Sequence, residues 1–117
     1  RGGQQFDYPT DDGTLSLSKA NYNGNVPGLY NPNGYSVATG SYPKNPYELY
    51  DMGGNVWEWC ADWYGPYMAG DQTDPRGPAA GRERVFRGGS WFNCRSEIRY
   101  DDPVYRSGSI GLRPVSP

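Results

Sequence analysis

A period of two in the hydrophobic pattern marks the clearest secondary-structure element of this chain. Within residues 56–63 one alternating set of positions is entirely apolar and includes three tryptophans. Such alternation is typical of a β-strand with one buried face, so we expect a strand from Val56 to Trp63. The side chains expected on the apolar face are Trp57, Trp59, Ala61 and Trp63, and those on the other face are Val56, Glu58, Cys60 and Asp62.

Three shorter elements are predicted from local signals. Residues 84–87 are expected to form a short strand that ends at Gly88-Gly89, where missing side chains permit close backbone approach. A last strand is predicted from Ile110 to Val115. Upstream, Pro46 to Tyr50 is expected to form one helical turn, because Pro suits the first helical position and Gly53-Gly54 follows as a stop.

The remainder of the chain is predicted to be ordered loop. Residues 1–19 contain strong turn signals, residues 20–46 are dense in Asn, Gly, Pro and Tyr without periodicity, and residues 65–83 indicate a surface excursion. Only 35% of the chain is hydrophobic, yet 4 Trp and 11 Tyr supply large areas to bury, which argues against disorder. At 117 residues the chain is at most a single domain, residues 1–117.

Composition excludes several function classes. The 11 basic and 13 acidic residues give a net charge of -2, which provides no basic patch for nucleic acid. The chain has no histidine, so the usual general base and the commonest transition-metal ligand are missing. No apolar run approaches the length of a membrane span, so none is expected. The chain does not begin with Met, and we expect a processed product, a fragment or the visible part of a larger protein.

Two blocks rich in glycine and aromatic residues, Asp51 to Tyr64 and Arg84 to Trp91, are followed by a third block, Gly111-Leu112-Arg113. In this order they resemble the formylglycine-generating-enzyme, or sulfatase-modifying-factor, family, and Arg1-Gly2-Gly3 and Ala20-Asn21-Tyr22 are similar to it too. The resemblance runs the whole length of the chain. It implies an α+β fold of this type, related to the C-type-lectin-like fold, with short strands and long ordered loops. Residues 1–117 would be the C-terminal part of such a domain, with the upstream part absent.

The segment that carries catalysis in active family members differs here. Those members place two redox-active, copper-binding cysteines shortly after the Gly-Gly-Ser-aromatic motif. Here the motif is followed by residues 92–99, which contain Cys94 alone. Cys94 directly precedes Arg95, which resembles a structural arginine, so it matches neither catalytic cysteine. A related branch holds iron with histidines, and this chain has none. We therefore expect no catalytic residues and no copper, as in a pseudoenzyme.

A first calcium site is predicted around Asp51, Gly54, Val56 and Glu58. Calcium prefers several oxygen ligands that mix carboxylates with backbone carbonyls. Two carboxylates that flank a glycine-containing bend can converge on one point, and the matching family positions bind calcium through the same groups. The alternative is that Asp51 caps the bend and Glu58 pairs with an arginine.

The resemblance suggests a second calcium site, formed by Asn21 and Tyr22 with Asn33 and Tyr35. The family supplies an aspartate where this chain has Asn33, and an amide keeps an oxygen but removes the charge that attracts a divalent ion. The alternative is that these asparagines satisfy the backbone of the surrounding loop.

The two cysteines, Cys60 and Cys94, lie on segments that the family packs close together. A disulfide between them would stabilise a secreted, loop-rich domain by about 2–4 kcal/mol. The alternatives are two buried free thiols, or a redox or copper pair.

A ligand groove is a further expectation from the resemblance. An arginine beside a tryptophan could stack or bind a carboxylate, although such arginines also tie loops together. Residues 100–109 are polar and rich in Tyr, Ser and Gly, a composition typical of adaptable contact surfaces. The groove candidates are Ser90, Trp91, Arg95, Arg99, Tyr105 and Arg113.

These expectations lead to a non-catalytic, calcium-stabilised binding or structural module. We expect it outside the cytoplasm, periplasmic or secreted, where a protein partner or the missing N-terminal part of the domain completes it. One alternative is a copper-dependent oxidase that converts a substrate cysteine to formylglycine, which a close cysteine pair would support. The other is a lectin-like ligand-binding domain with a variable C-terminal loop surface. Fold alone does not choose among them.

Overall fold

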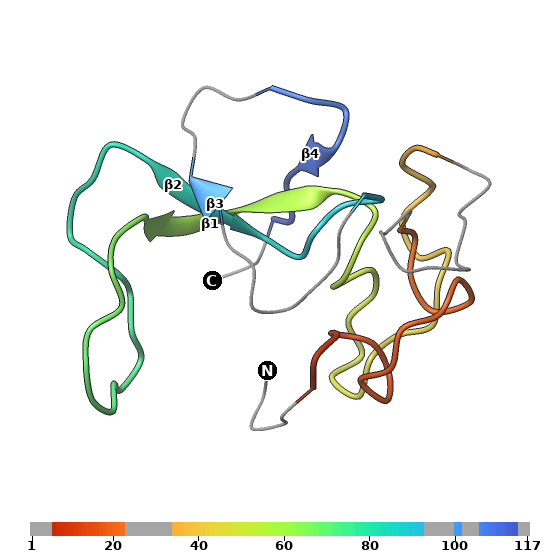
Figure 1. Ribbon diagram of the computed structural model, residues 1–117, viewed down its shortest axis with the longest axis horizontal. Helices are drawn as coiled ribbons and strands as arrows, with labels where there is room; N and C mark the ends of the chain where they lie inside the picture. The colour runs from red at the N-terminus through yellow and green to blue at the C-terminus, as the bar shows by residue number, and fades with distance from the viewer. Residues whose placement is uncertain (1–5, 23–33, 93–99, 102–105, 115–117) are drawn as a thin grey trace.

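A small four-stranded sheet organises the chain (Figure 1). The computed structural model describes residues 6–22, 34–92, 100–101 and 106–114. The sheet has the order β3-β2-β1-β4, with β1 antiparallel to β2, β2 antiparallel to β3, and β1 parallel to β4. The strands are β1 (Trp57–Trp63), β2 (Arg84–Arg87), β3 (Tyr100–Asp101) and β4 (Ile110–Gly111). The strands predicted over residues 56–63 and 84–87 are therefore confirmed.

An irregularity interrupts the pairing of β1 with β2. Trp59 lies opposite Phe86 and Trp63 lies opposite Arg84, so β1 places more residues than β2 between the same two pairs. A bulge of this kind breaks the strict alternation of faces. Ala61, expected on the apolar face, is exposed for this reason. The predicted alternation is correct for the first half of the strand only.

Aromatic packing forms the core of the sheet. Trp57 and Phe86 are buried, and both Trp57 and Trp59 meet the Phe86 ring edge to face, at centroid distances of 5.5 and 5.1 Å. Such pairs add stabilisation beyond the area they bury. A second buried cluster, Ala20 with Tyr22, lies in the N-terminal loop and is covered by Tyr8, Leu15 and Leu17.

Two sequence predictions need correction. The segment from Pro46 to Tyr50 is a turn and not a helical turn, and no helix occurs among the described residues. The Asn45 side chain explains this, because its Oδ1 accepts hydrogen bonds from the backbone N–H groups of Tyr47 and Leu49 at 2.9 and 3.1 Å. An Asn side chain that bonds its own downstream backbone competes with helix. The last strand covers Ile110–Gly111 and does not continue through residues 112–114.

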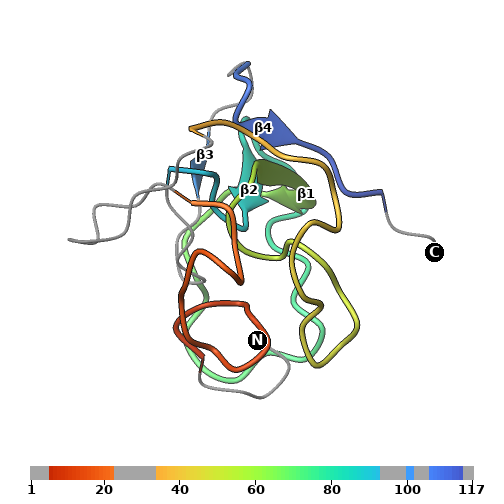
Figure 2. The same ribbon diagram turned by 90° about the vertical axis from the view of Figure 1, so that its right-hand side faces the viewer.

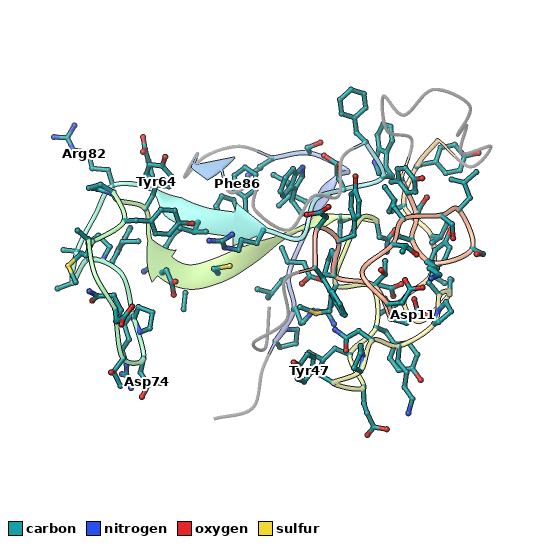
Figure 3. All side chains as sticks on the ribbon, turned by 60° about the horizontal axis from the view of Figure 1, so that its bottom comes forward. Asp11, Tyr47, Tyr64, Asp74, Arg82 and Phe86 are labelled. Atoms are coloured by element: carbon teal, nitrogen blue, oxygen red, sulfur yellow. The ribbon has the colours of Figure 1, made fainter. Side chains whose placement is uncertain are left out.

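Loops occupy both ends of the sheet. The N-terminal loops and residues 34–56 lie at the start of β1, and the excursion of residues 65–83 extends from the other end, as Figures 1 and 2 show. Figure 3 places Asp74 in this excursion, far from Asp11. Arg84 stacks 3.6 Å from the Trp63 ring centroid and so closes the base of the excursion between β1 and β2. Arg87 donates to the Tyr67 hydroxyl at 2.8 Å, which anchors the excursion to the sheet.

No helix in the described segments is long and apolar enough to cross a membrane.

Candidate functional site

The bend before β1 is held by a buried asparagine. Asn55 has a φ of 62°, and its side-chain Oδ1 accepts from Asn21 Nδ2 at 3.1 Å and from the Val37 N–H at 2.9 Å. Its backbone N–H also donates to the Asn21 carbonyl at 2.7 Å. Asn tolerates the left-handed region better than most residues. These bonds fix the bend rigidly, and with it the positions of Asp51 and Glu58 on either side.

Glycine is required at the neighbouring position. Gly54 has a φ of 78°, and a Cβ added there would lie 2.3 Å from the Asn21 carbonyl oxygen. Its N–H donates to the Gly88 carbonyl at 2.8 Å, which ties the bend to the end of β2. Gly54 and Asn55 are therefore explained by backbone conformation and close packing.

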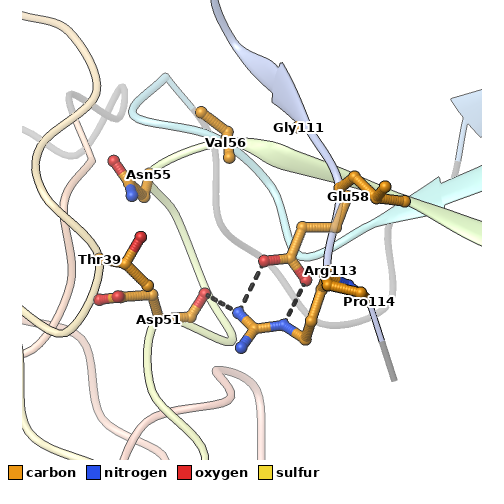
Figure 4. Close-up of a pocket in the computed structure, with 9 residues that line it drawn as sticks. Thr39, Asp51, Asn55, Val56, Glu58, Gly111, Arg113 and Pro114 are labelled. Carbon is orange, nitrogen blue, oxygen red and sulfur yellow. Dashed lines mark hydrogen bonds and ion pairs between the residues drawn. The ribbon is translucent and has the colours of Figure 1, made fainter. Parts of the chain in front are cut away.

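A cavity of about 370 Å³ opens beside this bend. It gathers three of the four residues predicted to form the first calcium site, and Gly54 lies in the adjoining bend without lining it. Figure 4 shows how the carboxylates and the C-terminal segment surround the space. The lining residues are Thr39, Asp51, Asn55, Val56, Glu58, Gly111, Leu112, Arg113 and Pro114.

Arg113 binds the carboxylate of Glu58 with two hydrogen bonds. Its Nε donates to Oε2 at 2.7 Å and its Nη2 donates to Oε1 at 2.6 Å. The same Nη2 lies 3.4 Å from the Asp51 carbonyl oxygen (Figure 4). The hydrogen bonds to Glu58 raise the pKa of Arg113 above its ordinary value. Paired, charge-assisted bonds of this kind are among the strongest side-chain contacts.

Asp51 has one carboxylate oxygen in use and one without a partner. Its Oδ2 accepts from the Gly40 N–H at 2.6 Å, whereas Oδ1 is buried with no hydrogen-bond partner among the described residues. Burial of an unpaired polar atom is costly, and a carboxylate oxygen is a natural ligand for a hard cation. This oxygen is the feature of the cavity that best fits a metal ion.

The cavity thus fits calcium in part. Asp51, Val56 and Glu58 border one space and Asp51 offers a free oxygen, but both oxygens of Glu58 are held by Arg113. These are the contacts of the alternative interpretation, in which Asp51 caps the bend and Glu58 pairs with an arginine. No cluster of three acidic or cysteine side chains suited to a metal occurs in the part of the chain that the structure describes. Calcium binding at this site stays a prediction.

At the second predicted calcium site, the asparagine side chain that the structure describes is hydrogen-bonded to loop backbone. Asn21 and Tyr35 are brought together, because Asn21 Nδ2 donates to the Tyr35 carbonyl at 2.9 Å. Asn21 and Tyr22 are almost fully buried, and the Tyr35 side chain is exposed. Asn33 lies outside the described residues. The Asn21 amide therefore serves the loop backbone here, and calcium at this site also stays a prediction.

Cys60 is half-buried in β1, and its thiol has no disulfide partner among the described residues. Burial raises the pKa of the thiol, and the nearby Asp62 carboxylate adds to the increase. A raised pKa makes a cysteine a poor nucleophile at neutral pH. Cys94 lies outside the described residues, so the predicted disulfide stays a prediction.

The predicted ligand groove is only partly described. Ser90 is buried and its Oγ accepts from the Phe92 N–H at 3.2 Å, so it supports the loop. Trp91 contacts the Phe92 ring at 6.3 Å. Arg113 borders the cavity beside the bend and a larger groove, and neither space is lined by Ser90 or Trp91. Three further candidates, Arg95, Arg99 and Tyr105, lie outside the described residues.

A larger groove was not anticipated from the sequence. It has a volume of about 1190 Å³ and borders β1 on the side of Trp59 and Cys60. It is lined by segments that are far apart in the sequence, from Phe6 to Arg113, so no single stretch of the chain carries a signal for it. Apolar residues that line it include Phe6, Tyr8, Tyr47, Leu49, Met52, Trp59 and Leu112.

Comparison with known proteins identifies the family. The model of the sulfatase-modifying factor enzyme 1-like domain matches residues 1–116. The formylglycine-generating enzyme of Streptomyces coelicolor is 40% identical over 84 residues, which is 62% of this chain and 26% of that protein. The inactive C-alpha-formylglycine-generating enzyme 2 of Bos taurus is 41% identical over 93 residues, 71% of this chain and 27% of that protein. This chain belongs to the sulfatase-modifying factor family.

The solved structures agree. Treponema denticola variable protein 1 superimposes with a TM-score of 0.73 and 31% identity, over 95% of this chain and 41% of that one. The chain spans between a tenth and about a quarter of the curated relatives it matches, and less than half of this solved structure. The fold of the family is thus confirmed for a region that corresponds to part of those longer proteins.

Proposed function

We propose that this chain is a non-catalytic, calcium-stabilised binding or structural module of the formylglycine-generating-enzyme family. The observation that carries the proposal is the content of the segment after Trp91. The chain has two cysteines, one of which, Cys60, lies in β1, so only one remains for that segment. A formylglycine generator needs a close thiolate pair to bind copper(I) and exchange with the substrate thiol. The likeness to an inactive family member supports the same conclusion.

The binding or structural role is supported by the large groove beside β1. Tyr47, Leu49 and Leu112 border it and are each more than two-fifths exposed. Exposed apolar surface of this kind is typical of an interaction face. Its occupant is a protein segment, supplied by a partner or by the N-terminal part of the domain, because the matched relatives extend well beyond the region that this chain covers. The module works in a larger protein or complex outside the cytoplasm.

Calcium is the ion proposed for the cavity beside the bend. Asp51 and Glu58 would supply carboxylate oxygens, with carbonyl oxygens of Gly54 and Val56 completing the set. When bound, the ion would supply positive charge that stabilises the junction between the bend and β1. The unpaired Asp51 oxygen supports this assignment.

A second candidate function is ligand recognition through the C-terminal loop surface. The observation that favours it is the likeness to a protein named variable protein 1 from Treponema denticola. An alignment of residues 100–109 in closely related homologues of this chain tests it. Sequence variation concentrated in that segment supports recognition, and a uniform sequence there contradicts it.

One incubation tests whether the chain converts a substrate cysteine to formylglycine. The reduced, copper-loaded chain is mixed with a cysteine-containing sulfatase-type peptide, and peptide mass is followed with time. The proposal predicts no aldehyde above the peptide-only background. An active formylglycine-generating enzyme, such as that of Streptomyces coelicolor, serves as the positive control for the peptide. Aldehyde formation by this chain would support the oxidase alternative.

A further inference from the structure

Resting on the calcium proposal above, we propose that Arg113 is an internal counter-ion that competes with calcium for Glu58 and so sets the calcium affinity of the cavity. The arginine belongs to the short Gly111-Leu112-Arg113 block after β4, and it reaches across the sequence to β1.

The guanidinium uses the oxygens that a metal ion would need. Glu58 Oε1 and Oε2 are 2.6 and 2.7 Å from Arg113 nitrogens, and Nη2 also faces the Asp51 carbonyl at 3.4 Å. A calcium ion binds carboxylate oxygens at about 2.3–2.6 Å. A divalent ion and a two-point guanidinium contact on the same carboxylate face exclude each other, because both need the same lone pairs and both are positive. Calcium coordination on this edge of the Glu58 carboxylate therefore requires Arg113 to leave.

Arg113 balances the charge of only one of the two carboxylates at the cavity. It neutralises Glu58, but toward Asp51 it reaches the backbone carbonyl and not the carboxylate, whose Oδ1 is buried and has no hydrogen-bond partner in the part of the chain that the structure describes. The cavity therefore keeps one unbalanced carboxylate when Arg113 is in place. A divalent ion would balance both carboxylates at once. The cavity therefore has two states. In one, Arg113 binds Glu58 and leaves the Asp51 carboxylate without a balancing charge; in the other, a calcium ion binds both carboxylates and Arg113 is released.

The guanidinium also has a second space to enter. Arg113 and Glu58 each line both the cavity beside the bend and the large groove beside β1. The neighbouring Leu112 is 73% exposed and Pro114 is exposed, so the segment that carries Arg113 has few packing constraints. On release from Glu58 the side chain can turn into the groove and remain hydrated. The exchange thus needs a side-chain rotation and no change in the sheet.

Calcium titration of three proteins by isothermal calorimetry tests the competition. The proteins are the chain itself, Arg113→Gln, and Arg82→Gln as a control with the same charge change on the exposed excursion. We expect Arg113→Gln to bind calcium about tenfold more tightly or better, because a hydrogen-bonded charge pair no longer has to be broken. Arg82→Gln should match the unmodified chain. Arg113→Lys, which keeps the charge but loses the two-point fork, should fall between.

The outcomes separate the two proposals. Equal calcium affinities in all proteins would overturn the competition and leave calcium binding intact. Weaker binding by Arg113→Gln would also overturn it, since it would make the arginine a support for the ion. Absence of heat and of any calcium-dependent rise in melting temperature in every protein would remove both proposals. Where Arg113→Gln fails to fold by circular dichroism, tighter binding by Arg113→Lys supports the competition, and unchanged binding contradicts it.

Discussion

Asn21 and Asn55, 34 residues apart in the sequence, share a buried side-chain hydrogen bond of 3.1 Å and a backbone bond of 2.7 Å. This pair joins the N-terminal loop to the bend that precedes β1, and the bend positions both carboxylates of the candidate cation cavity. The loop-rich part of the fold is therefore held by buried amides, whereas the sheet is held by aromatic packing around Phe86. The arrangement of the cavity therefore depends on the buried amides of Asn21 and Asn55.

Replacement of Asn55 should destabilise the chain strongly. Asn55→Ala removes bonds to Asn21 and to Val37 and places a Cβ-bearing residue without a polar side chain at a φ of 62°. We expect a loss of about 3 kcal/mol or more in the free energy of unfolding, because buried partners are left unpaired. Urea denaturation measures it. Asn55→Gly relieves the φ strain but not the lost bonds, so it should lie between, and a Gly variant as stable as the original chain would contradict the account.

Two glycines with similar backbone angles should respond differently to alanine. Gly54→Ala brings a Cβ to 2.3 Å from the Asn21 carbonyl oxygen, whereas Gly70, with a φ of 85°, has nothing within 4 Å. Gly70→Ala should cost about 1 kcal/mol from backbone strain alone. Gly54→Ala should cost several times more, because backbone atoms must move. Thermal unfolding of both variants compares them, and equal melting temperatures would refute the close packing.

The ion pair between Glu58 and Arg113 should contribute measurably in the absence of calcium. Glu58→Gln in excess chelator should lower the free energy of unfolding by about 1–2 kcal/mol, because the pair is largely shielded from solvent and joined by two bonds. Glu48→Gln, which breaks the exposed pair with Lys44, should change it by less than about 0.5 kcal/mol. Chemical denaturation measures both variants, and equal effects would show that the Glu58 pair has no special weight.

The turn around Asp12 should make a contribution to folding stability that is lost in acid. Hydrogen bonds from Lys19, and then from Thr14, hold the pKa of the Asp12 carboxyl well below its ordinary value of 3.8. A folded-state pKa below the unfolded one stabilises the chain above pH 3.8, and this contribution is lost as the pH falls through the folded value. Melting temperatures between about pH 6 and pH 2 should fall less steeply for Asp12→Asn than for the original chain. Parallel curves would contradict the assignment.

The sequence indicated some parts of this structure well because their signals are local. Alternation predicted β1, and a short run before Gly88 predicted β2. The turn at residues 46–50 was mistaken for helix, because the hydrogen bonds of the Asn45 side chain outweighed a proline signal. The bulge in β1 depends on pairing with β2, which no single strand encodes.

The candidate site, like the fold, could be predicted only in part from the sequence. The family resemblance pointed to Asp51 and Glu58, and the structure places both at one cavity. The sequence offered an arginine as an alternative partner for Glu58 but could not say which one. Arg113 is 55 residues away, and only the parallel pairing of β4 with β1 brings it close. The large groove, formed by segments from every part of the chain, had no local signature.

The central proposal is that this family member lacks the chemistry of a formylglycine generator, and a measurement of copper(I) affinity tests it most directly. The reduced chain is titrated with copper(I) against a coloured chelator of known affinity, and Cys60→Ser and Cys94→Ser are measured beside it. The account predicts that the chain takes no copper from the chelator, because Cys60 is half-buried in β1 and no close thiol pair follows Trp91. Stoichiometric copper(I) binding that either serine variant abolishes would contradict it.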